Sequence, residues 1–192
     1  DTTGAIDIDT SNFDTRNVLD MSKMFLDNTN LISLDVSSFN TSNVLDFSEM
    51  FAGCSNIYSL DISNFDTSKA RNTSYMFYYM SSVEVLNVAN FKTNEVMDMG
   101  YMFQFCRKIA ELDVSKFDTR KVVNMNSMFE ECVNVSTLDV SNFDTSLVTN
   151  LARMFYSTSA VKYLNVNNFN TKKAVNMEYM FYGCNTTNSI DL

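Results

Sequence analysis

The residues with the clearest potential for chemistry are acidic side chains that recur at one position of a 26-residue repeat. This acidic row contains Asp9, Asp35, Asp61, Asn87, Asp113, Asp139, Asn165 and Asp191. Carboxylates about 5 Å apart could bind calcium, which takes several oxygen ligands, or a basic partner. The alternative is structural, with each side chain accepting hydrogen bonds from hydroxyls such as that of Ser37. The two asparagines favour this alternative. We therefore predict no metal site and keep calcium at Asp35, Asp61, Asp113 and Asp139 as the weaker hypothesis.

Aromatic side chains at predicted surface positions form a second group of candidate functional residues. The main group contains Tyr75, Tyr78, Tyr79, Tyr101 and Phe105, and a smaller group contains Tyr156, Tyr179 and Tyr182. Clustered tyrosines suit protein or glycan contacts, because each combines a large apolar ring with a polar hydroxyl. The alternative is that the rings only fill gaps between neighbouring repeats. The sequence leaves both interpretations open.

Composition argues against several classes of function. The chain has no histidine, which excludes Ser-His-Asp triads, Cys-His dyads and His-ligated zinc. Its four glycines form no phosphate-binding loop, and a net charge of −9 disfavours nucleic acid and anionic membranes. A glycosidase needs two carboxylates in different environments, whereas the acidic row repeats one environment. We therefore expect no enzyme activity, no cofactor, no nucleic-acid partner and no membrane insertion.

The elements that must position these residues come from one motif repeated seven times. The dipeptide Met-Phe begins at Met24, Met50, Met76, Met102, Met128, Met154 and Met180, with the same 26-residue step between each pair. A Phe-x-Thr motif keeps this step from Phe13 to Phe169. The register leaves no room for a linker, so residues 1–192 are predicted to form a single solenoid domain. The last strand, at Ile190 to Leu192, has no polar cap. We therefore expect a fragment of a longer protein, with possible end-to-end self-association through that strand.

Each repeat is predicted to contain one strand and one helix. In residues 31–54, Leu34 and Val36 alternate with polar neighbours, which indicates a short half-buried strand. The spacing i, i+3, i+4, i+7 then predicts a helix with a buried face of Phe47, Met50, Phe51 and Cys54. The residue before that helix is always Asp or Asn, which is typical of an N-cap. Eight such strands, from Ile8 to Ile190, should pair in parallel. The sheet should line a concave face, since helices pack farther apart than strands do.

Two further columns of equivalent residues are interpreted as structural. The unbroken threonine column, from Thr15 to Thr171, should satisfy backbone groups along the stack. The four cysteines, Cys54, Cys106, Cys132 and Cys184, share one repeat position, and Met80 fills the same slot. We expect four free thiols, because helices about 9 Å apart would hold neighbouring cysteines beyond disulfide reach.

The consensus LxxLDVSxFxTSxVxDMSxMFxxC resembles the repeat of BspA-like bacterial surface proteins, with residues 132–147 reading CVNVSTLDVSNFDTSL. The resemblance covers nearly the whole chain. It implies an α/β repeat solenoid of the leucine-rich-repeat type, on extracellular proteins anchored at the bacterial cell surface and used for adhesion. The family supplies no catalytic residues. Repeat three departs from the consensus at Arg71 and Thr73, and repeat four at Asn87, Ala89 and Lys92.

These observations predict a non-catalytic cell-surface module that binds a protein or glycan of a host or a neighbouring cell. The alternative is a passive spacer that presents another domain. A spacer should have interchangeable repeats, whereas repeats three and four carry most of the aromatic group and deviate from the consensus. The predicted contact residues are therefore the aromatic ones.

Overall fold

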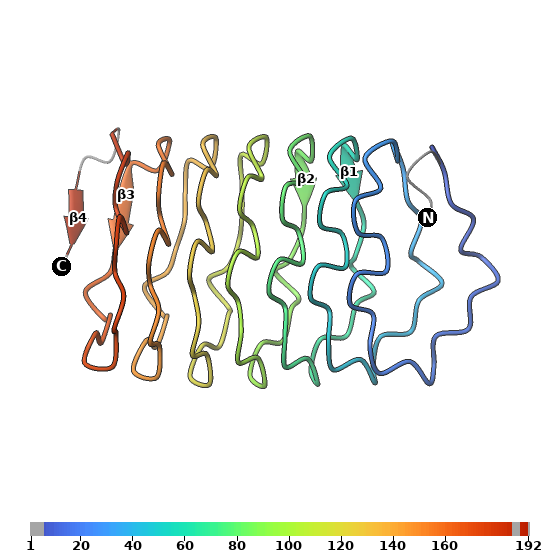
Figure 1. Cartoon of the computed structure of the whole chain (residues 1–192), viewed down its shortest axis with the longest axis horizontal. Coiled ribbons are helices and arrows are strands. Elements are labelled where there is room, and N and C mark those ends of the chain that lie inside the picture. The colour runs from blue at the N-terminus through green and yellow to red at the C-terminus, as the bar shows by residue number, and fades with distance from the viewer. Residues whose placement is uncertain (1–5, 186–188, 192) are drawn as a thin grey trace.

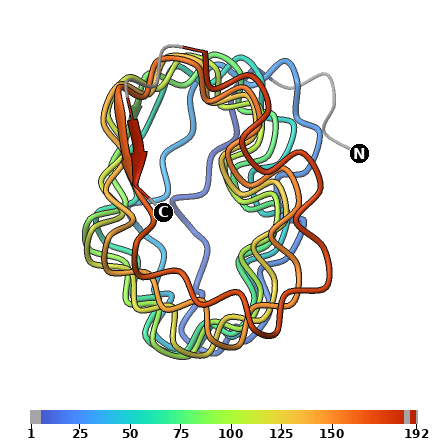
Figure 2. The same ribbon diagram turned by 90° about the vertical axis from the view of Figure 1, so that its left-hand side faces the viewer.

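The computed structural model describes residues 6–185 and 189–191. Within these residues the chain forms coils that stand side by side along one axis (Figure 1), and the coils overlie one another when viewed along that axis (Figure 2). The described part of the chain contains four short strands: β1 (Ser59–Leu60), β2 (Val85–Leu86), β3 (Tyr163–Asn165) and β4 (Ser189–Asp191). The remaining backbone of the coils is built from turns, bends and single bridges.

The pairing of the coils confirms the 26-residue period. Strand β1 pairs with β2 and β3 with β4, both in parallel, with Leu60 opposite Leu86 and Leu164 opposite Ile190. Isolated parallel bridges link further residues 26 positions apart, and one series runs through Asp20, Asp46, Asn72, Asp98, Asn124, Asn150 and Asn176. One coil therefore corresponds to one sequence repeat. This bridge series continues along seven coils.

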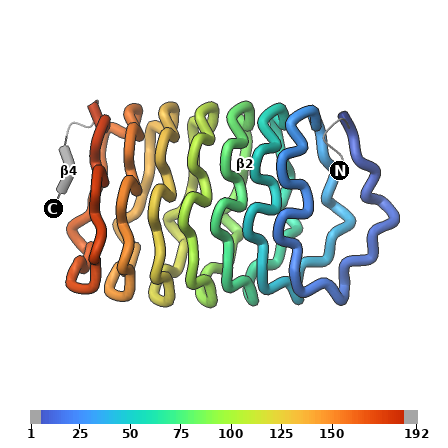
Figure 3. The backbone as a smooth tube through the Cα atoms, viewed as in Figure 1, coloured from blue at the N-terminus to red at the C-terminus, as the bar shows by residue number. Residues whose placement is uncertain are grey.

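The helix predicted in each repeat is absent, and tight turns take its place (Figure 3). In the second repeat, alternate backbone amides donate hydrogen bonds to carbonyl oxygens of the next coil. The donors are the amides of Phe47, Glu49, Phe51 and Gly53. The amides between them, of Met50, Ala52 and Cys54, donate to carbonyls three residues back. An α-helix instead uses every interior amide for a carbonyl four residues back. The prediction of an α/β fold with one helix per repeat is therefore wrong for the described residues.

The strand prediction is only partly right. Strands include Leu60, Leu86, Leu164 and Ile190 of the eight predicted positions. A single bridge between Glu111 and Thr137 lies beside Leu112 and Leu138, whereas Ile8 and Leu34 lie outside any strand. The more continuous ladder runs instead through the Asp and Asn column that was expected to cap helices. Leu192, part of the predicted terminal strand, lies outside the described residues.

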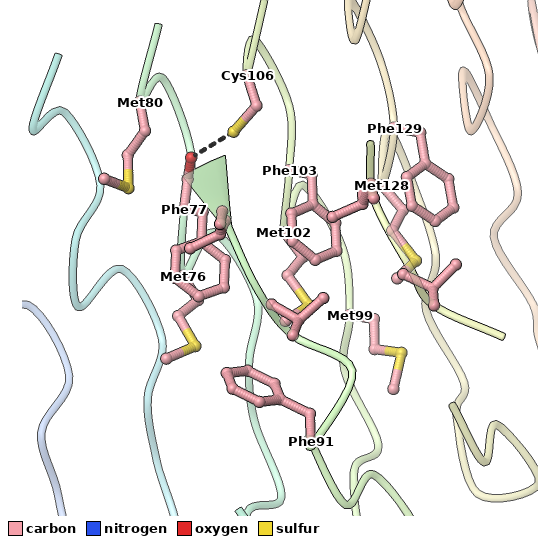
Figure 4. Packing of buried hydrophobic residues seen from close by; sticks show 14 of the residues in the cluster. Met76, Phe77, Met80, Phe91, Met99, Met102, Phe103, Cys106, Met128 and Phe129 are labelled. Atoms are coloured by element: carbon pink, nitrogen blue, oxygen red, sulfur yellow. Dashed lines mark hydrogen bonds between the residues drawn. The ribbon is translucent and has the colours of Figure 1, made fainter. Parts of the chain in front are cut away.

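Like residues stack on like residues in the core, which forms one cluster along the coils. Successive phenylalanine rings of the Met-Phe motif lie close together, with centroids 5.7 Å apart for Phe25 and Phe51 and 5.6 Å apart for Phe77 and Phe103. Figure 4 shows part of this column beside the methionines. The axes of packed helices would stand about 9 Å apart. The predicted concave and convex faces therefore lose their basis, because parallel bridges give the coils a strand-like spacing where helices were expected.

Side-chain oxygens of Asp and Asn stabilise turns of the coils by accepting hydrogen bonds from backbone amides. Asp46 was expected to cap a helix; its Oδ1 accepts a hydrogen bond from the amide of Ser48, two residues on. The same contact occurs at Asp35 with the amide of Ser37 and at Asn40 with that of Ser42. Such Asx turns reverse the chain without proline or glycine. This explains how a chain of 192 residues folds with no proline and four glycines.

The threonine column is structural, as predicted. The buried hydroxyl of Thr93 donates to the carbonyl of Asp118 in the next coil (3.0 Å) and accepts from the amide of the same residue (2.7 Å). Thr41 and Asp66 repeat the pair of bonds at 3.2 Å and 2.7 Å. Each buried threonine of this column, from Thr15 to Thr145, therefore satisfies two backbone groups that would otherwise lack partners inside the stack.

The four cysteines are free thiols that also bind between coils. Cys106 Sγ lies 3.1 Å from the carbonyl oxygen of Phe77, and Cys132 Sγ lies 3.2 Å from that of Phe103. Figure 4 marks the first of these contacts. The wide helix spacing on which the prediction rested does not exist. Instead, each sulfur is turned toward a carbonyl of the preceding coil.

Candidate binding surface

The five main aromatic residues come together on two neighbouring coils. We call Tyr75, Tyr78, Tyr79, Tyr101 and Phe105 the first tyrosine cluster. The rings of Tyr75 and Tyr101 stack face to face, with centroids 4.2 Å apart and planes 9° apart. Tyr78 meets the ring of Phe105 edge-on at 5.9 Å, and Tyr79 does so at 5.7 Å. The cluster is therefore one connected aromatic surface.

The backbone of the turn segment positions these rings. Tyr75 and Tyr79 have φ angles of 57° and 56°, and the equivalent Tyr101 and Phe105 have 61° and 62°. This left-handed region is rare for bulky residues. At one of the two columns other coils place Gly53 and Gly183, for which positive φ carries no steric penalty. The aromatic side chains thus occupy positions where the backbone itself favours glycine.

The cluster is partly packed and partly open to solvent. Tyr75, Tyr78, Tyr101 and Phe105 are half-buried, whereas Tyr79 exposes 43% of its surface. Burial of the phenol raises the pKa of Tyr75, and the nearby carboxylate of Glu49 adds to the rise. The rings therefore fill space between coils, as one interpretation held, and also present an exposed aromatic surface, as the other requires.

The smaller aromatic group forms a second tyrosine cluster at the last two repeats. Tyr156 stacks on Tyr182 with ring centroids 5.0 Å apart, and Tyr179 meets Tyr182 edge-on at 5.7 Å. Tyr179 and Tyr182 expose 52% and 58% of their surfaces. Tyr179 also has a positive φ, of 54°. The two clusters share repeat positions, so both belong to one edge of the stack.

Arginine and glutamate side chains that sequence reasoning missed lie between the two clusters. The guanidinium carbon of Arg107 is 5.1 Å from the ring centroid of Phe105, and Arg107 also pairs with Glu131 at 3.3 Å. Arg153 lies 4.3 Å from the ring centroid of Tyr156 and pairs with the buried Glu130 at 2.7 Å. Their repeat positions hold different residues in other coils, so no column of identical residues drew attention to them.

From Asp9 to Asn165, each side chain of the acidic row accepts a hydrogen bond from the amide two residues on in its own turn, and the side chain of Asp191 lies outside the described residues. The carboxylates of Asp113 and Asp139 accept hydrogen bonds from the amides and hydroxyls of Ser115 and Ser141, respectively. At Asn87 the amide of Ala89 donates in the same way. These bonds agree with the structural interpretation. They also lower the pKa of the exposed carboxyls of Asp9, Asp35, Asp61 and Asp113.

The acidic row does not assemble a metal site among the described residues. Residues 6–185, whose side chains are described, hold no group of three or more Asp, Glu or Cys side chains placed to ligate an ion. The calcium hypothesis named Asp35, Asp61, Asp113 and Asp139, which stand in a line with one carboxylate per coil. A line of this kind offers few ligands at any one point, whereas calcium takes six to eight oxygens.

Comparison with known proteins places the chain in a family. The family model described as "Mycoplasma protein of unknown function, DUF285" matches residues 1–110 and again residues 80–191. The chain therefore belongs to this family. The two matches begin about three 26-residue repeats apart, which is consistent with a repeat protein. No curated protein matches the chain. Among the described residues, no helix is long and apolar enough to cross a membrane.

Proposed function

We propose that this member of the DUF285 family is a non-catalytic binding module of the bacterial cell surface. Its partner would be a protein or glycan on a host or neighbouring cell. The observation that carries the proposal is the first tyrosine cluster, a connected and partly exposed aromatic surface. The consensus that resembles BspA-like surface proteins supports an extracellular, surface-attached setting and a role in adhesion.

The first tyrosine cluster has the physical properties of an interaction hot spot. Hot spots are enriched in tyrosine, tryptophan and arginine, which gain apolar burial while keeping polar contacts. Tyr75 and Tyr101 hold each other in place by stacking, so little side-chain freedom remains to be lost on binding. Tyr79 packs edge-on against Phe105, so its exposed ring can also be covered by a partner at low entropic cost.

A non-catalytic role fits the way in which the carboxylates are used. Catalytic acids and bases have contrasting environments that separate their pKa values. In the acidic row, Asp9, Asp35, Asp61 and Asp113 have the same turn contact and the same direction of pKa shift. The row therefore provides repeated structural groups instead of an acid and a base.

A passive spacer is the second candidate, and the continuity of the backbone ladder favours it. Parallel bridges connect seven successive coils, and buried threonines pair neighbouring coils throughout. Such a stack would hold an attached domain at a fixed distance. A spacer has no need of aromatic side chains at positions that favour glycine, which is why we rank it second.

Adhesion of a surface-displayed chain tests the binding role. The test variant combines Tyr75→Ser, Tyr79→Gly, Tyr101→Ser and Phe105→Gly, because Ser127 and Gly53 occupy the equivalent positions of other coils. The matched control combines Tyr58→Ser and Tyr163→Ser, which remove exposed rings outside the cluster. We expect the test variant to lose at least tenfold in cells bound and the control to bind normally. Undiminished adhesion by a folded test variant would leave the spacer as the function.

A further inference from the structure

A groove crosses four neighbouring coils between strands β2 and β3 (Figure 1). Its first cavity, of about 400 Å³, is lined in part by Glu111 and Asp113. A second cavity of about 300 Å³ shares these two residues and also contacts Thr137 and Asp139. A third, of about 390 Å³, shares Thr137 and Asp139 with the second. Because each cavity shares its lining with the next, the three form one continuous groove.

The backbone pairing keeps the lining of the groove in register. A parallel bridge joins Glu111 to Thr137, so equivalent residues of neighbouring coils lie about 4.8 Å apart. The acidic row begins in this groove at Asn87 and ends at Asn165, which is three such steps, or about 14 Å. The same contacts therefore recur along the groove. A ligand that matches them is an extended polymer with repeating units.

Rigid polar groups line the middle of the groove. Asp113 Oδ1 accepts hydrogen bonds from the amide and the hydroxyl of Ser115, and Asp139 Oδ1 accepts the same pair from Ser141. Among the residues whose side chains are described, neither the Oδ2 atoms of these aspartates nor the hydroxyl of Thr137 has a hydrogen-bond partner. The turns therefore hold each carboxylate in place, while one oxygen of each stays available to a ligand.

The residue types of the groove favour a neutral ligand. The acidic row reads Asn87, Asp113, Asp139 and Asn165 there, so only two of its four members carry charge. The third cavity is also lined by Lys162, which would repel a cationic polymer at that end. A hydroxyl group can bond at all four positions, because it donates to a carboxylate and both donates to and accepts from an amide.

We propose that this groove binds a neutral polysaccharide that lies across the coils. Its hydroxyl groups bond to the acidic row and to Thr137, with similar contacts at each coil. Several modest contacts made by one linked chain combine into a useful affinity. The lining contains no residue of either tyrosine cluster. The inference therefore adds a second binding surface and goes beyond the proposed function.

Isothermal titration calorimetry with defined oligosaccharides tests the inference. The probes are the neutral hexamers cellohexaose, mannohexaose and chitohexaose, their dimers, and fully deacetylated chitohexaose, which is cationic in mildly acidic buffer. We expect at least one neutral hexamer to bind at least tenfold more tightly than its dimer, because a dimer covers only part of the groove. No binding by any neutral hexamer would overturn the proposal, and so would tighter binding of the deacetylated hexamer than of chitohexaose.

Two variants and a matched control locate the site. Thr137→Trp places a large side chain in the middle of the groove at an exposed position, and we expect it to weaken hexamer binding at least tenfold. Ser33→Trp is the control, because Ser33 is exposed at the equivalent repeat position outside the three cavities. Equal effects of the two tryptophans would overturn the assignment to the groove.

The second variant tests whether charge is needed. Asp113→Asn with Asp139→Asn should fold, because Asn87 makes the same turn contact. We expect it to bind the neutral hexamer within about twofold of the intact chain, since an amide also bonds to hydroxyl groups. A loss of tenfold or more by the folded variant would mean that binding depends on the carboxylate charge, which contradicts a neutral ligand matched by either residue.

The four-ring variant of the adhesion test separates this inference from the proposed function. We expect it to bind the neutral hexamer as the intact chain does. If it loses the hexamer and Thr137→Trp does not, glycans bind at the tyrosine clusters, so the proposed function stands and only this inference fails. If adhesion does not depend on the rings, the proposed function fails whatever the groove binds.

Discussion

The side chains of Tyr79 and Phe105 stand on residues with φ of 56° and 62°, where a Cβ atom crowds the following carbonyl. Strained backbone of this kind persists when the surrounding structure imposes it, and it tends to collect at functional sites. Here the inter-coil hydrogen bonds impose it, since the amide of Tyr79 donates to the carbonyl of Gln104. The inter-coil hydrogen bonds therefore fix the positive φ. Placing an aromatic residue instead of glycine at this position then costs conformational free energy.

This cost predicts an unusual order of stability at Tyr79. Because glycine accepts positive φ and alanine does not, Tyr79→Gly should be more stable than Tyr79→Ala by about 1 kcal/mol. Tyr78 is the matched control, because it is absent from the positive-φ residues and alanine should there be the better replacement. Urea denaturation of the four variants measures the difference. The same order at both positions would show that backbone strain at Tyr79 is unimportant.

The cysteines offer a second test at single positions. Burial raises the pKa of Cys54 and of Cys106 to about 12 and raises that of Cys132 as well. At pH 8 these groups remain protonated in the folded chain, and the thiolate is the reactive form. We expect iodoacetamide to modify the half-buried Cys184 first and the other three only after unfolding. Mass spectrometry of the labelled peptides gives the order, with guanidinium-treated chain as the control for full reaction.

At the level of elements, the sequence predicted burial well and backbone conformation poorly. Phe47, Met50, Phe51 and Cys54 are all fully buried, as the helical spacing indicated. A chain of tight turns brings the same residues to one side, so the pattern of apolar positions cannot distinguish it from a helix. The deciding factor is where the amides bond, and alternate amides bond to the next coil. That choice depends on neighbours one full repeat away, which a local pattern does not contain.

The Asx turns predict how stability depends on pH. Hydrogen bonds to the turn amide and hydroxyl lower the folded-state pKa of Asp61, and the Arg16 guanidinium lowers that of Asp14 to about 2. The unfolded chain, with aspartate pKa values near 3.9, therefore binds protons first as the pH falls. The stabilisation is complete above about pH 4 and is lost as the pH approaches 2.

Urea denaturation from pH 6 to pH 2.5 should show this loss. Asp61→Asn is the informative variant, because the equivalent Asn87 makes the same turn contact with an amide that does not titrate. We expect the variant to fold and to show a smaller fall in stability over this range. A steeper fall in the variant would mean that the Asp61 carboxylate is not stabilised in the folded state.

In the whole molecule, each coil depends on the two beside it. Phe103 is fully buried between the rings of Phe77 and Phe129, at 5.6 Å and 5.9 Å. Phe103→Ala should destabilise the chain by about 3–5 kcal/mol, because a cavity would form inside a continuous column. Phe181→Ala, at a partly buried ring, should cost less. Equal losses in denaturation experiments would contradict a core built from stacked neighbours.

The sequence predicted the aromatic residues of the candidate site but not the charged residues that lie beside them. Because they occupy equivalent repeat positions, Tyr75 was predicted to lie beside Tyr101, and Tyr79 beside Phe105. Both pairs are in contact in the structure. Arg107 and Arg153 were missed because each reaches its carboxylate across a coil boundary by a rotamer that no repeat pattern specifies. The positive φ angles were also missed, because a tyrosine in the sequence does not indicate a left-handed backbone conformation as a glycine does.

The constant 26-residue register has a consequence for how such chains can change in length. Every backbone pairing joins residue i to residue i + 26, so duplication or deletion of one complete repeat restores each pairing with new partners. Unequal recombination between these similar repeats would thus yield foldable proteins of graded length. Each repeat added between the two tyrosine clusters would increase the distance between them by about 4.8 Å, which is one inter-strand spacing. Variation in copy number would then adjust the distance between contact points without any new interface having to evolve.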